Sequence, residues 1–311
     1  MKMRYRILTL GRLAKEFKSA FDDFAAQENF TIDHIENVNQ QTLDRYNAIA
    51  AFSISRELNI SHVKWIHSFG AGVDAFVNRT DLASDVIITR TVGKLGEKIA
   101  EYCLAHTLAC KQHIHETYES QKLNEWKQRT PIELSHSKIA VIGTGNMGRT
   151  IAKLFTILGA EVTGINRDGH RTPEFSQCYP LHQNLSDTLL IDTLISTLPN
   201  APGTKEILTL DFFSQFHAVH FINVGRGSVV KEETILAAIE KGYVSRATLD
   251  VFETEPLPES SPLWKNPKVF ITPHQASLTD IDDVKESFTS AYQAIQEDKT
   301  NNLFVDLGKG Y

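Results

Sequence analysis

The stretch Lys138-Ile-Ala-Val-Ile-Gly-Thr-Gly-Asn-Met-Gly148 decides the fold. Its apolar residues 139–142 predict a strand that is buried on both faces. Apolar side chains at helical spacing then follow as far as Gly159, a common type of helix end. Between strand and helix, Gly143, Gly145 and Gly148 have the spacing G-x-G-x-x-G. Such glycines permit a tight turn, let a pyrophosphate approach the backbone and let the helix pack close to the strand, so the stretch predicts a dinucleotide site at the helix N-terminus.

Composition limits the remaining possibilities. The chain of 311 residues is long enough for two domains, and its formal charge of −6 argues against nucleic acid or an anionic membrane as a partner. No apolar run is long enough for a transmembrane helix, and residues 1–11 resemble a first strand more than a signal peptide. The 3 cysteines have no metal-ligand spacing, so we expect no metal, reduced thiols and a cytoplasmic protein.

Further strands are predicted after the glycine turn, at residues 161–165, 193–197, 218–224, 246–249 and 269–272. The residues just beyond the last three of these strands include Arg226, Asp250 and His274. Ligands of a parallel sheet bind beyond the carboxyl ends of its strands. We therefore expect these three side chains to gather at the same edge of the sheet as the glycine turn.

The side chains at this edge suit hydride exchange between a nicotinamide cofactor and a carbonyl or alcohol, in which the protein holds the substrate and moves one proton. His274 suits the proton step because the pKa of an imidazole lies near neutrality. Glu255 can hydrogen-bond the far ring nitrogen and favour the imidazolium. Arg226 can bind a 2-keto carboxylate and polarise its keto oxygen. The residues alone leave two alternatives open: an arginine that only pairs with a carboxylate, and a structural or solvated histidine.

The end of the strand at 161–165 bears on the choice of cofactor. An acidic residue at this position usually binds the ribose 2′-hydroxyl of NAD, whereas a nearby arginine accommodates the 2′-phosphate of NADP. The sequence has neutral Asn166 followed by Arg167, whose charged fork suits a phosphate. We therefore predict NADP(H) as the favoured cofactor. NAD(H) stays open as the alternative, with Asp168 as the ribose acid.

The first hundred residues predict a small parallel α/β unit, with strands at 5–10, 48–52, 63–69 and 86–89. The third strand runs into Gly70, Ala71 and Gly72, whose N–H groups suit a carboxylate or phosphate, although an ordinary glycine turn explains them equally well. A long helix is expected at 97–123, either as a spine between two domains or as a dimer contact. Trp126 follows it, and both an interface and a core position are open for its ring.

Four stretches recur in a fixed order. They are Gly143-Thr-Gly-Asn-Met-Gly148, Asn223-Val-Gly-Arg-Gly227, Leu249-Asp-Val-Phe-Glu-Thr-Glu-Pro-Leu-Pro258, and Pro262-Leu-Trp264 leading into Thr272-Pro-His274. In order and separation they resemble the D-isomer-specific 2-hydroxyacid dehydrogenases. The resemblance implies that Arg226 binds and polarises the substrate, that Glu255 and not Glu253 partners the acid/base His274, and that Asp250 binds the nicotinamide carboxamide. It also implies that Gly70, Ala71 and Gly72 hold the substrate carboxylate.

Within that family the chain looks most similar to the glyoxylate/hydroxypyruvate reductases. The similarity lies in Gly93-Lys-Leu-Gly-Glu-Lys-Ile-Ala-Glu-Tyr102, the region of Trp126, and the pair Asn166-Arg167. Gln275 and Lys98 depart from the family pattern. The resemblance implies reduction of small 2-keto acids to D-2-hydroxy acids. Two alternatives remain open: a 3-phosphoglycerate dehydrogenase-like enzyme and a non-catalytic, NAD(H)-sensing binding protein.

The family fold implies an α/β protein in which a Rossmann dinucleotide-binding domain is inserted into a flavodoxin-like substrate-binding domain. We expect residues 1–97 plus 277–311 to form the substrate-binding domain and residues 98–276 to form the NAD(P)-binding domain. The family also implies a homodimer. The residues expected to contact the cofactor are Gly143, Gly145, Asn146, Met147, Gly148, Asn166, Arg167, Leu198, Pro199, Thr204, Val224 and Asp250.

Overall fold

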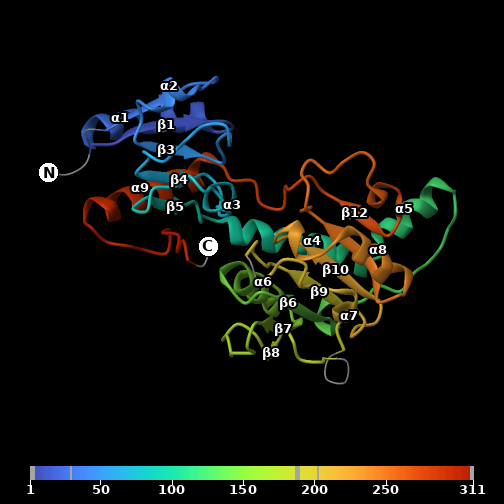
Figure 1. Cartoon of the computed structure of the whole chain (residues 1–311). Helices are drawn as coiled ribbons and strands as arrows, with labels where there is room; N and C mark the ends of the chain where they lie inside the picture. Colours follow the sequence, from blue (N-terminus) through green and yellow to red (C-terminus); the bar gives the residue numbers. More distant parts are fainter. Residues whose placement is uncertain (1–3, 29, 186–189, 202, 309–311) are drawn as a thin grey trace. The chain divides into compact units, whose positions relative to one another are not determined.

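The computed structural model describes residues 4–28, 30–185, 190–201 and 203–308. The chain forms two compact units, each with its own parallel sheet (Figure 1). The first unit comprises Met1–Leu95 and Thr279–Tyr311, and the second comprises Gly96–Leu278. The expected boundaries were at 97/98 and 276/277. The first falls slightly earlier because helix α4 (Leu95–Lys111) begins two positions before the predicted helix start at 97.

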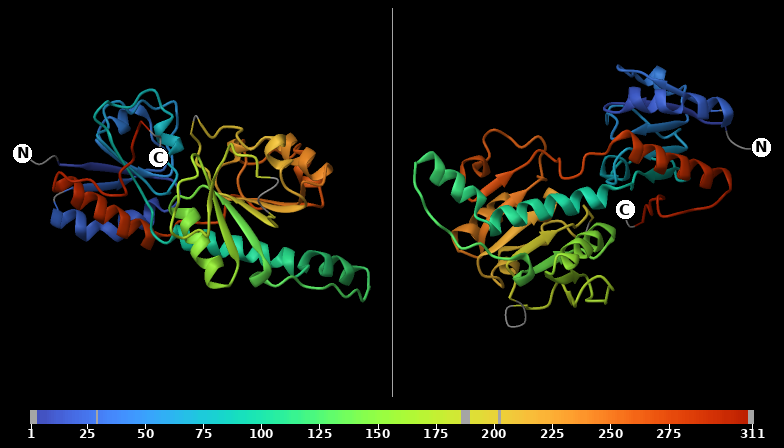
Figure 2. Two further views of the ribbon diagram at one scale, coloured as in Figure 1. Left: turned by 90° about the horizontal axis from the view of Figure 1, so that it is seen from below. Right: turned by 180° about the vertical axis from the view of Figure 1, so that it is seen from behind.

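The sheet of the first unit has the strand order β2-β1-β3-β4-β5, and all of its strand pairs are parallel. Helices α1 (Ala14–Glu28) and α9 (Ile281–Gln296) lie side by side in Figure 2, and their aromatic side chains share one core. The ring centroids of Phe17 and Phe288 are 4.9 Å apart. Short helices α2 (Gln40–Leu43) and α3 (Asp74–Val77) contribute to the core on the other face. The strands are β1 (Arg6–Leu10), β2 (Thr31–His34), β3 (Ala48–Ala51), β4 (Trp65–Ser68) and β5 (Ile87–Arg90).

The sheet of the second unit has the order β12-β11-β10-β9-β6-β7-β8, again with parallel pairs only. The direction in which successive strands are added reverses between β6 and β9, and ligands of such sheets bind at this switch point. The strands are β6 (Lys138–Ile142), β7 (Glu161–Asn166), β8 (Cys178–Pro180), β9 (Thr193–Ser196), β10 (Val219–Asn223), β11 (Val244–Leu249) and β12 (Val269–Ile271).

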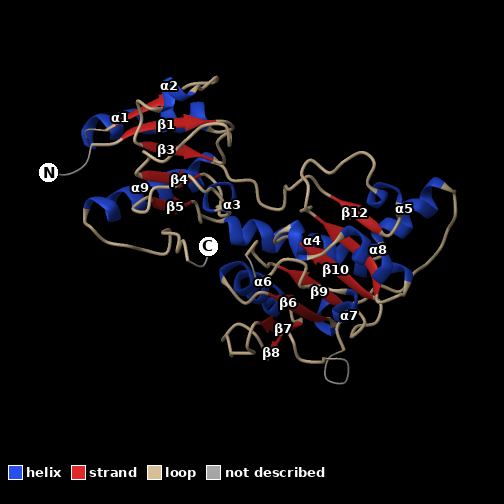
Figure 3. Cartoon of the chain, viewed as in Figure 1, coloured by secondary structure: helices blue, strands red, loops and turns tan. Residues whose placement is uncertain are grey.

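Both faces of this second sheet are covered, as Figure 3 shows. Alternate residues of β6 point to opposite faces. Ile139 and Val141 pack with α4 and α6 (Asn146–Ile157), whereas Ala140 and Ile142 lie in the core that includes α7 (Leu210–Phe213) and α8 (Glu232–Glu240). Burial on both faces explains why residues 139–142 are all apolar. None of the described helices is long and apolar enough to cross a membrane.

The predicted long helix at 97–123 is wrong. Helix α4 ends at Lys111, and a separate helix α5 (Ile114–Lys122) follows it. The break lies at His113, which has the left-handed φ of 52°. That conformation interrupts an α-helix, because its backbone twists with the opposite hand. The second helix and the segment after it carry exposed apolar side chains, and Trp126 is 95% exposed.

Candidate active site

The glycine turn has the geometry that the sequence predicts. Gly143 directly follows β6 and has a φ of 97°, which L-residues rarely adopt. A side chain at Gly148 would clash with the carbonyl oxygen of Gly143, so the helix can pack this close only with glycine there. Gly145 is the N-cap of the 12-residue helix α6, and a Cβ placed on it would meet nothing within 4 Å.

The start of α6 therefore fits a phosphate. Its N-cap provides no side-chain hydrogen bond to the first helical N–H groups. These groups carry the positive end of the helix dipole and attract anions. With open space over Gly145 and no acidic residue in the first turn, the backbone there can bind a dinucleotide pyrophosphate.

His274 and Glu255 form a close pair beyond β11 and β12. The Nδ1–H group of His274 donates to Glu255 Oε2 at 2.7 Å, and Glu255 Oε1 accepts from the Phe252 N–H at 2.9 Å. This hydrogen bond raises the pKa of His274 above its usual value, although burial opposes the effect. Burial by itself would raise the pKa of Glu255, but the bonds from His274 and Phe252 leave it below its usual value. The imidazole side chain is still 51% exposed.

Arg226 lies close enough to influence both members of this pair. Its positive charge lowers the pKa of Glu255 and opposes the rise in that of His274. The glycines beside it allow two close backbone approaches, because a side chain at Gly225 would strike Leu198 and one at Gly227 would strike Phe252. Arg226 is half-buried, and its Nη1 donates to the Gly225 carbonyl at 2.8 Å. The strand ends therefore bring together a proton carrier, a carboxylate and a guanidinium.

Asp250 is almost completely buried, at 1% exposure. Its Oδ1 accepts from the Thr272 hydroxyl at 2.6 Å and from the Gln275 N–H at 2.8 Å, and its Oδ2 accepts from the Ala276 N–H at 2.9 Å. The carboxylate thus holds the loop that carries His274. The sequence reasoning missed this role, which depends on contacts between residues more than twenty positions apart.

The end of β7 is occupied by a compact turn. Asn166 is buried: its Nδ2 donates to Thr144 Oγ1 at 3.1 Å and its Oδ1 accepts from Gly169 N at 2.7 Å. Asp168 is exposed and accepts from His170 Nδ1 at 2.9 Å. That hydrogen bond lowers the pKa of Asp168. Arg167 is exposed beside the turn.

The other expected cofactor residues lie at the ends of β6, β9 and β10, on the same edge of this sheet. Leu198 and Val224 are largely buried, whereas Asn146 is exposed. The hydroxyl of Thr204 donates within its own loop, to Pro199 O at 2.6 Å, and accepts from Ala201 N at 2.9 Å. It therefore shapes the loop after β9. Met147 and Pro199 are half-buried.

The loop expected to hold the substrate carboxylate belongs to the first unit. Gly70, Ala71 and Gly72 follow β4 after one intervening residue, Phe69, and are half-buried. Ser68 Oγ donates to Gly72 O at 3.0 Å and accepts from Gly70 N at 3.3 Å, which holds the loop in a tight turn. Arg90, at the end of the neighbouring β5, was missed by the sequence reasoning. Its Nε is buried without a hydrogen-bond partner among the described residues.

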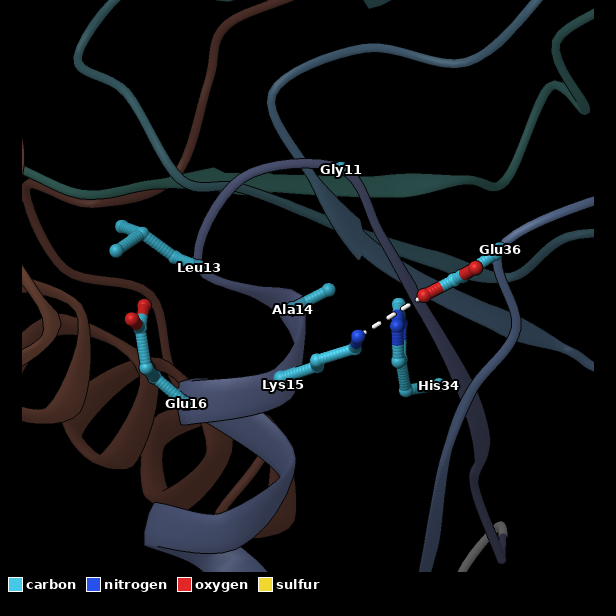
Figure 4. A pocket seen from close by; sticks show the side chains of 7 residues that line it. All are labelled: Gly11, Leu13, Ala14, Lys15, Glu16, His34 and Glu36. Atoms are coloured by element: carbon cyan, nitrogen blue, oxygen red, sulfur yellow. Dashed lines mark ion pairs between the residues drawn. The ribbon is translucent and has the colours of Figure 1, made fainter.

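A depression of about 380 Å³ opens in the first unit between the loop after β1 and the end of β2 (Figure 4). Lys15 and Glu36 form an ion pair across it at 2.9 Å. His34 lies beside this pair in the close-up view. None of the predicted site residues lines this depression. The groups that can carry out chemistry are instead at the strand ends of the second unit.

A family model described as D-isomer specific 2-hydroxyacid dehydrogenase, NAD binding domain, matches residues 104–276. The chain belongs to this family. The resemblance of the four sequence stretches is thereby confirmed, and so is the α/β fold with two parallel sheets. As a member of the family, the protein is an NAD(P)-dependent D-2-hydroxyacid dehydrogenase.

Named relatives agree with this assignment. The chain is 33% identical over 264 residues to glyoxylate/hydroxypyruvate reductase A of Photorhabdus laumondii, covering 81% of this chain and 83% of the relative. It is similar to the structure of an NADPH-dependent glyoxylate/hydroxypyruvate reductase from Sinorhizobium meliloti in complex with NADP and sulfate. That match has a TM-score of 0.87 and 25% identity, and covers 99% of this chain and 100% of the other.

A third comparison also matches a member of this family that was solved with a nicotinamide cofactor. A D-isomer specific 2-hydroxyacid dehydrogenase from Xanthobacter autotrophicus, in complex with NADPH and MES, matches with a TM-score of 0.86 at 25% identity. The match covers 99% of this chain and 100% of the other. Membership in the family implies a nicotinamide dinucleotide, and the open start of α6 fits its pyrophosphate.

Proposed function

We propose that the protein reduces small 2-keto acids of the glyoxylate and hydroxypyruvate type to D-2-hydroxy acids. One observation carries this proposal. The pair His274–Glu255 and the guanidinium of Arg226 lie at the strand ends of the same sheet that bears the glycine turn. The relatives named glyoxylate/hydroxypyruvate reductase support the choice of substrate class.

The proton step follows from the orientation of His274. Because Nδ1–H donates to Glu255, the other ring nitrogen, Nε2, is the one that can donate to a substrate. The negative charge of Glu255 stabilises the imidazolium, so the proton is in place before the reaction begins. A nicotinamide cofactor bound at this site would supply the hydride that the keto carbon accepts. His274 gives its proton to the keto oxygen, which becomes the hydroxyl of the product.

Arg226 is proposed to bind the substrate in two ways. A guanidinium presents parallel N–H donors that can bond the carboxylate and the keto oxygen together. Negative charge that develops on the keto oxygen is then stabilised by a fixed positive group. In the first unit, the N–H groups of Gly70, Ala71 and Gly72, whose loop Ser68 holds in a tight turn, are proposed to bind a carboxylate.

NADP(H) is the proposed cofactor. Arg167 is exposed beside the turn after β7 and can bind a 2′-phosphate. Asp168, the alternative ribose ligand, is bonded to His170. The side chain of Asn166 is bonded to Thr144, Gly169 and His170, and it presents no acidic group. Asp250 is proposed to bind the nicotinamide carboxamide, and the other residues expected at the cofactor are proposed to contact it through the backbone and side chains of their loops.

We further propose that the protein works as a homodimer in the cytoplasm. Trp126 is almost entirely exposed, and Ile114, Tyr118 and Leu123 are exposed nearby in the sequence. A second copy of the chain would remove this apolar surface from water. Exchange of Trp126 for Ser should then convert a dimer into a monomer in light-scattering measurements. A wild-type protein that is monomeric would contradict the proposal.

Steady-state oxidation of NADPH and NADH tests the function. The substrates are glyoxylate, hydroxypyruvate, pyruvate and phosphohydroxypyruvate. We expect rapid, NADPH-dependent reduction of the first two and a loss of about 10²-fold or more in kcat/KM for Arg226→Gln. Preferred turnover of phosphohydroxypyruvate would identify a 3-phosphoglycerate dehydrogenase-like enzyme. Tight binding of NADPH without turnover of any of the four would contradict the proposal.

Exchange of Arg167 for Ser tests the cofactor assignment. We expect KM for NADPH to rise by about tenfold while KM for NADH stays nearly constant, because only the former carries a 2′-phosphate. Arg171→Ser is the matched control, since Arg171 is also exposed in the same segment. An equal effect in both variants would speak against a specific role of Arg167.

A further inference from the structure

A chain of hydrogen bonds leads from helix α4 to the loop that carries His274. The hydroxyl of Tyr102, on α4, lies 2.6 Å from Thr272 Oγ1, and Thr272 Oγ1 donates to Asp250 Oδ1 at 2.6 Å. Because the single hydroxyl proton of Thr272 goes to the carboxylate, Tyr102 must be the donor to Thr272. Burial raises the pKa of Tyr102, so its hydroxyl keeps its proton.

Asp250, the acceptor at the end of this series of hydrogen bonds, holds His274 in an unusual backbone conformation. His274 has the left-handed φ of 50°, a conformation that a residue with a side chain rarely adopts. Such conformations persist only where the surrounding structure determines them. Here the carboxylate of Asp250 accepts from the N–H groups of Gln275 and Ala276, and its backbone carbonyl accepts from the His274 N–H at 2.9 Å. One buried residue thus holds three consecutive N–H groups.

We propose that Tyr102 is a positioning residue for His274, acting through Thr272 and Asp250. Its hydroxyl satisfies Thr272 Oγ1, which leaves the hydroxyl proton of Thr272 directed at Asp250. The carboxylate then stays aligned with the N–H groups of the loop at 274–276. This keeps the imidazole within hydrogen-bond distance of Glu255. The catalytic consequence rests on the proposed function, in which His274 is the proton donor.

The surroundings of Tyr102 allow its hydroxyl to be removed by substitution without loss of the packing of its ring. The ring packs against His106 with centroids 4.3 Å apart, a contact that phenylalanine would keep. The hydroxyl bonds Thr272, and the negative charge of Asp250 contributes to the raised pKa of Tyr102. Tyr102→Phe therefore removes one donor and little else. Tyr292→Phe is the matched control, because Tyr292 in the first unit also loses one hydrogen bond there, to Glu28 O at 3.1 Å.

The first measurement is steady-state kinetics with glyoxylate and NADPH. We expect kcat to fall by about tenfold in Tyr102→Phe and by about a hundredfold in Thr272→Val, because a small misplacement of a reacting group is costly. KM for NADPH should stay within about twofold of wild type in both variants. Since both groups act along one chain, the double variant should be no slower than Thr272→Val alone.

The second measurement needs no turnover. We expect NMR titration of the histidines to show a lower pKa for His274 in Tyr102→Phe than in wild type, because the bond to Glu255 loosens. The charges that face His274 are those of Glu255, Arg226 and Asp250, and none of these is altered by the exchange. A variant with His274→Gln assigns the signal. Tyr292→Phe should leave it unchanged.

Three outcomes would overturn the role of Tyr102. They are an unchanged pKa of His274 in Tyr102→Phe, an equal kinetic loss in Tyr292→Phe, and additive losses in the double variant. If the wild-type protein turns over none of the 2-keto acids, the proposed function fails. The NMR titration then decides the role of Tyr102 by itself.

Discussion

Histidines in the interior of the two sheets differ sharply from the one at the strand ends. His67 in β4 and His220 in β10 are buried and have hydroxyl groups as partners, Thr89 Oγ1 and Thr248 Oγ1, each at 2.9 Å. Burial lowers the pKa of each to about 3. His274 instead has a carboxylate as its partner, and its pKa is raised.

The difference shows that the partner and the access to water decide what a histidine can do. A hydroxyl satisfies a neutral ring but stabilises its charged form poorly, so the interior histidines stay neutral at physiological pH. A carboxylate at hydrogen-bond distance stabilises the imidazolium directly. His274 can therefore hold a proton that it later gives away, and half of its side chain remains accessible to a substrate.

The largest expected effect is the loss of His274. We expect His274→Ala to lower kcat/KM for glyoxylate by about 10³-fold, because the variant lacks the proton donor. The control is His220→Gln, which changes a histidine that is buried in the same sheet. Its kcat/KM should stay within about threefold of wild type. Equal losses of kcat/KM in both variants would show that the position of His274 at the sheet edge gives it no catalytic role beyond that of a buried histidine.

Neutralisation of the carboxylate partner should have the next largest effect. The raised pKa of His274 keeps the imidazolium populated at higher pH, so reduction of the keto acid should decline only on the alkaline side. Glu255→Gln keeps a hydrogen-bond acceptor but loses the charge, so the pKa of His274 falls. The alkaline limb of the kcat/KM profile should then move to lower pH, with a loss of about tenfold or more near pH 8.

Glu253→Gln is the control for this exchange. Glu253 is exposed and lies two positions away, and its exchange should leave the profile unchanged. The resemblance to the family separated Glu255 from Glu253 at the level of sequence. In the structure the carboxylate of Glu255 accepts a hydrogen bond from the imidazole of His274. A profile that moves with Glu253→Gln and not with Glu255→Gln would reverse this assignment.

The strands of the second sheet could be predicted because burial on both faces leaves a clear apolar run, as in residues 139–142. Strand β2 (Thr31–His34) gave no such signal, since only Ile32 is buried in it. Its extended form comes from pairing with β1, residue by residue from Arg6 opposite Thr31 to Thr9 opposite His34. A four-residue edge strand of this kind is determined by its neighbour and not by its own composition.

The site was predictable to a similar degree. His274, Arg226 and Asp250 could be placed at one edge because each follows a predicted strand. The link from Tyr102 to Thr272 could not, because it joins residues 170 positions apart through side chains. The break at His113 was also hidden, since nothing in the residues around it marks a helix end in the way that Gly159 does.

The interior histidines make a prediction about stability. For His67 the folded pKa, about 3, is below the ordinary value of 6.5, so the unfolded chain binds a proton that the folded protein excludes. The free energy of unfolding is therefore unaffected by this difference above pH 6.5, and it decreases as the pH falls from 6.5 toward 3. Near pH 5 the cost is about 2 kcal/mol. Glutamine is never charged. Between neutral pH and pH 5, the free energy of unfolding of His67→Gln should therefore fall by about 2 kcal/mol less than that of wild type.

Urea unfolding followed by tryptophan fluorescence measures this difference. Trp65 is buried in the core of the first unit beside His67, with ring centroids 6.3 Å apart, whereas Trp126 and Trp264 are exposed. The change in emission therefore reports mainly on the unit that contains His67. At neutral pH the variant should be less stable by about 1 kcal/mol, because bonds to Thr89 and Thr91 are weakened. Identical pH dependence in both proteins would contradict a neutral His67.

The smallest effect is expected for a pair that repeats the chemistry of His274 and Glu255 on the surface. His170 Nδ1 and Asp168 Oδ1 are 2.9 Å apart, but their side chains are 65% and 69% exposed. Water and salt screen the charges of such a pair, so the pair contributes little to stability or activity. We expect Asp168→Asn to leave the urea midpoint and the pH profile of kcat/KM unchanged. We also expect KM for NADPH and for NADH to change by less than about twofold. A selective rise in KM for NADH would identify Asp168 as the ribose ligand, and the same type of pair would then have a function without burial.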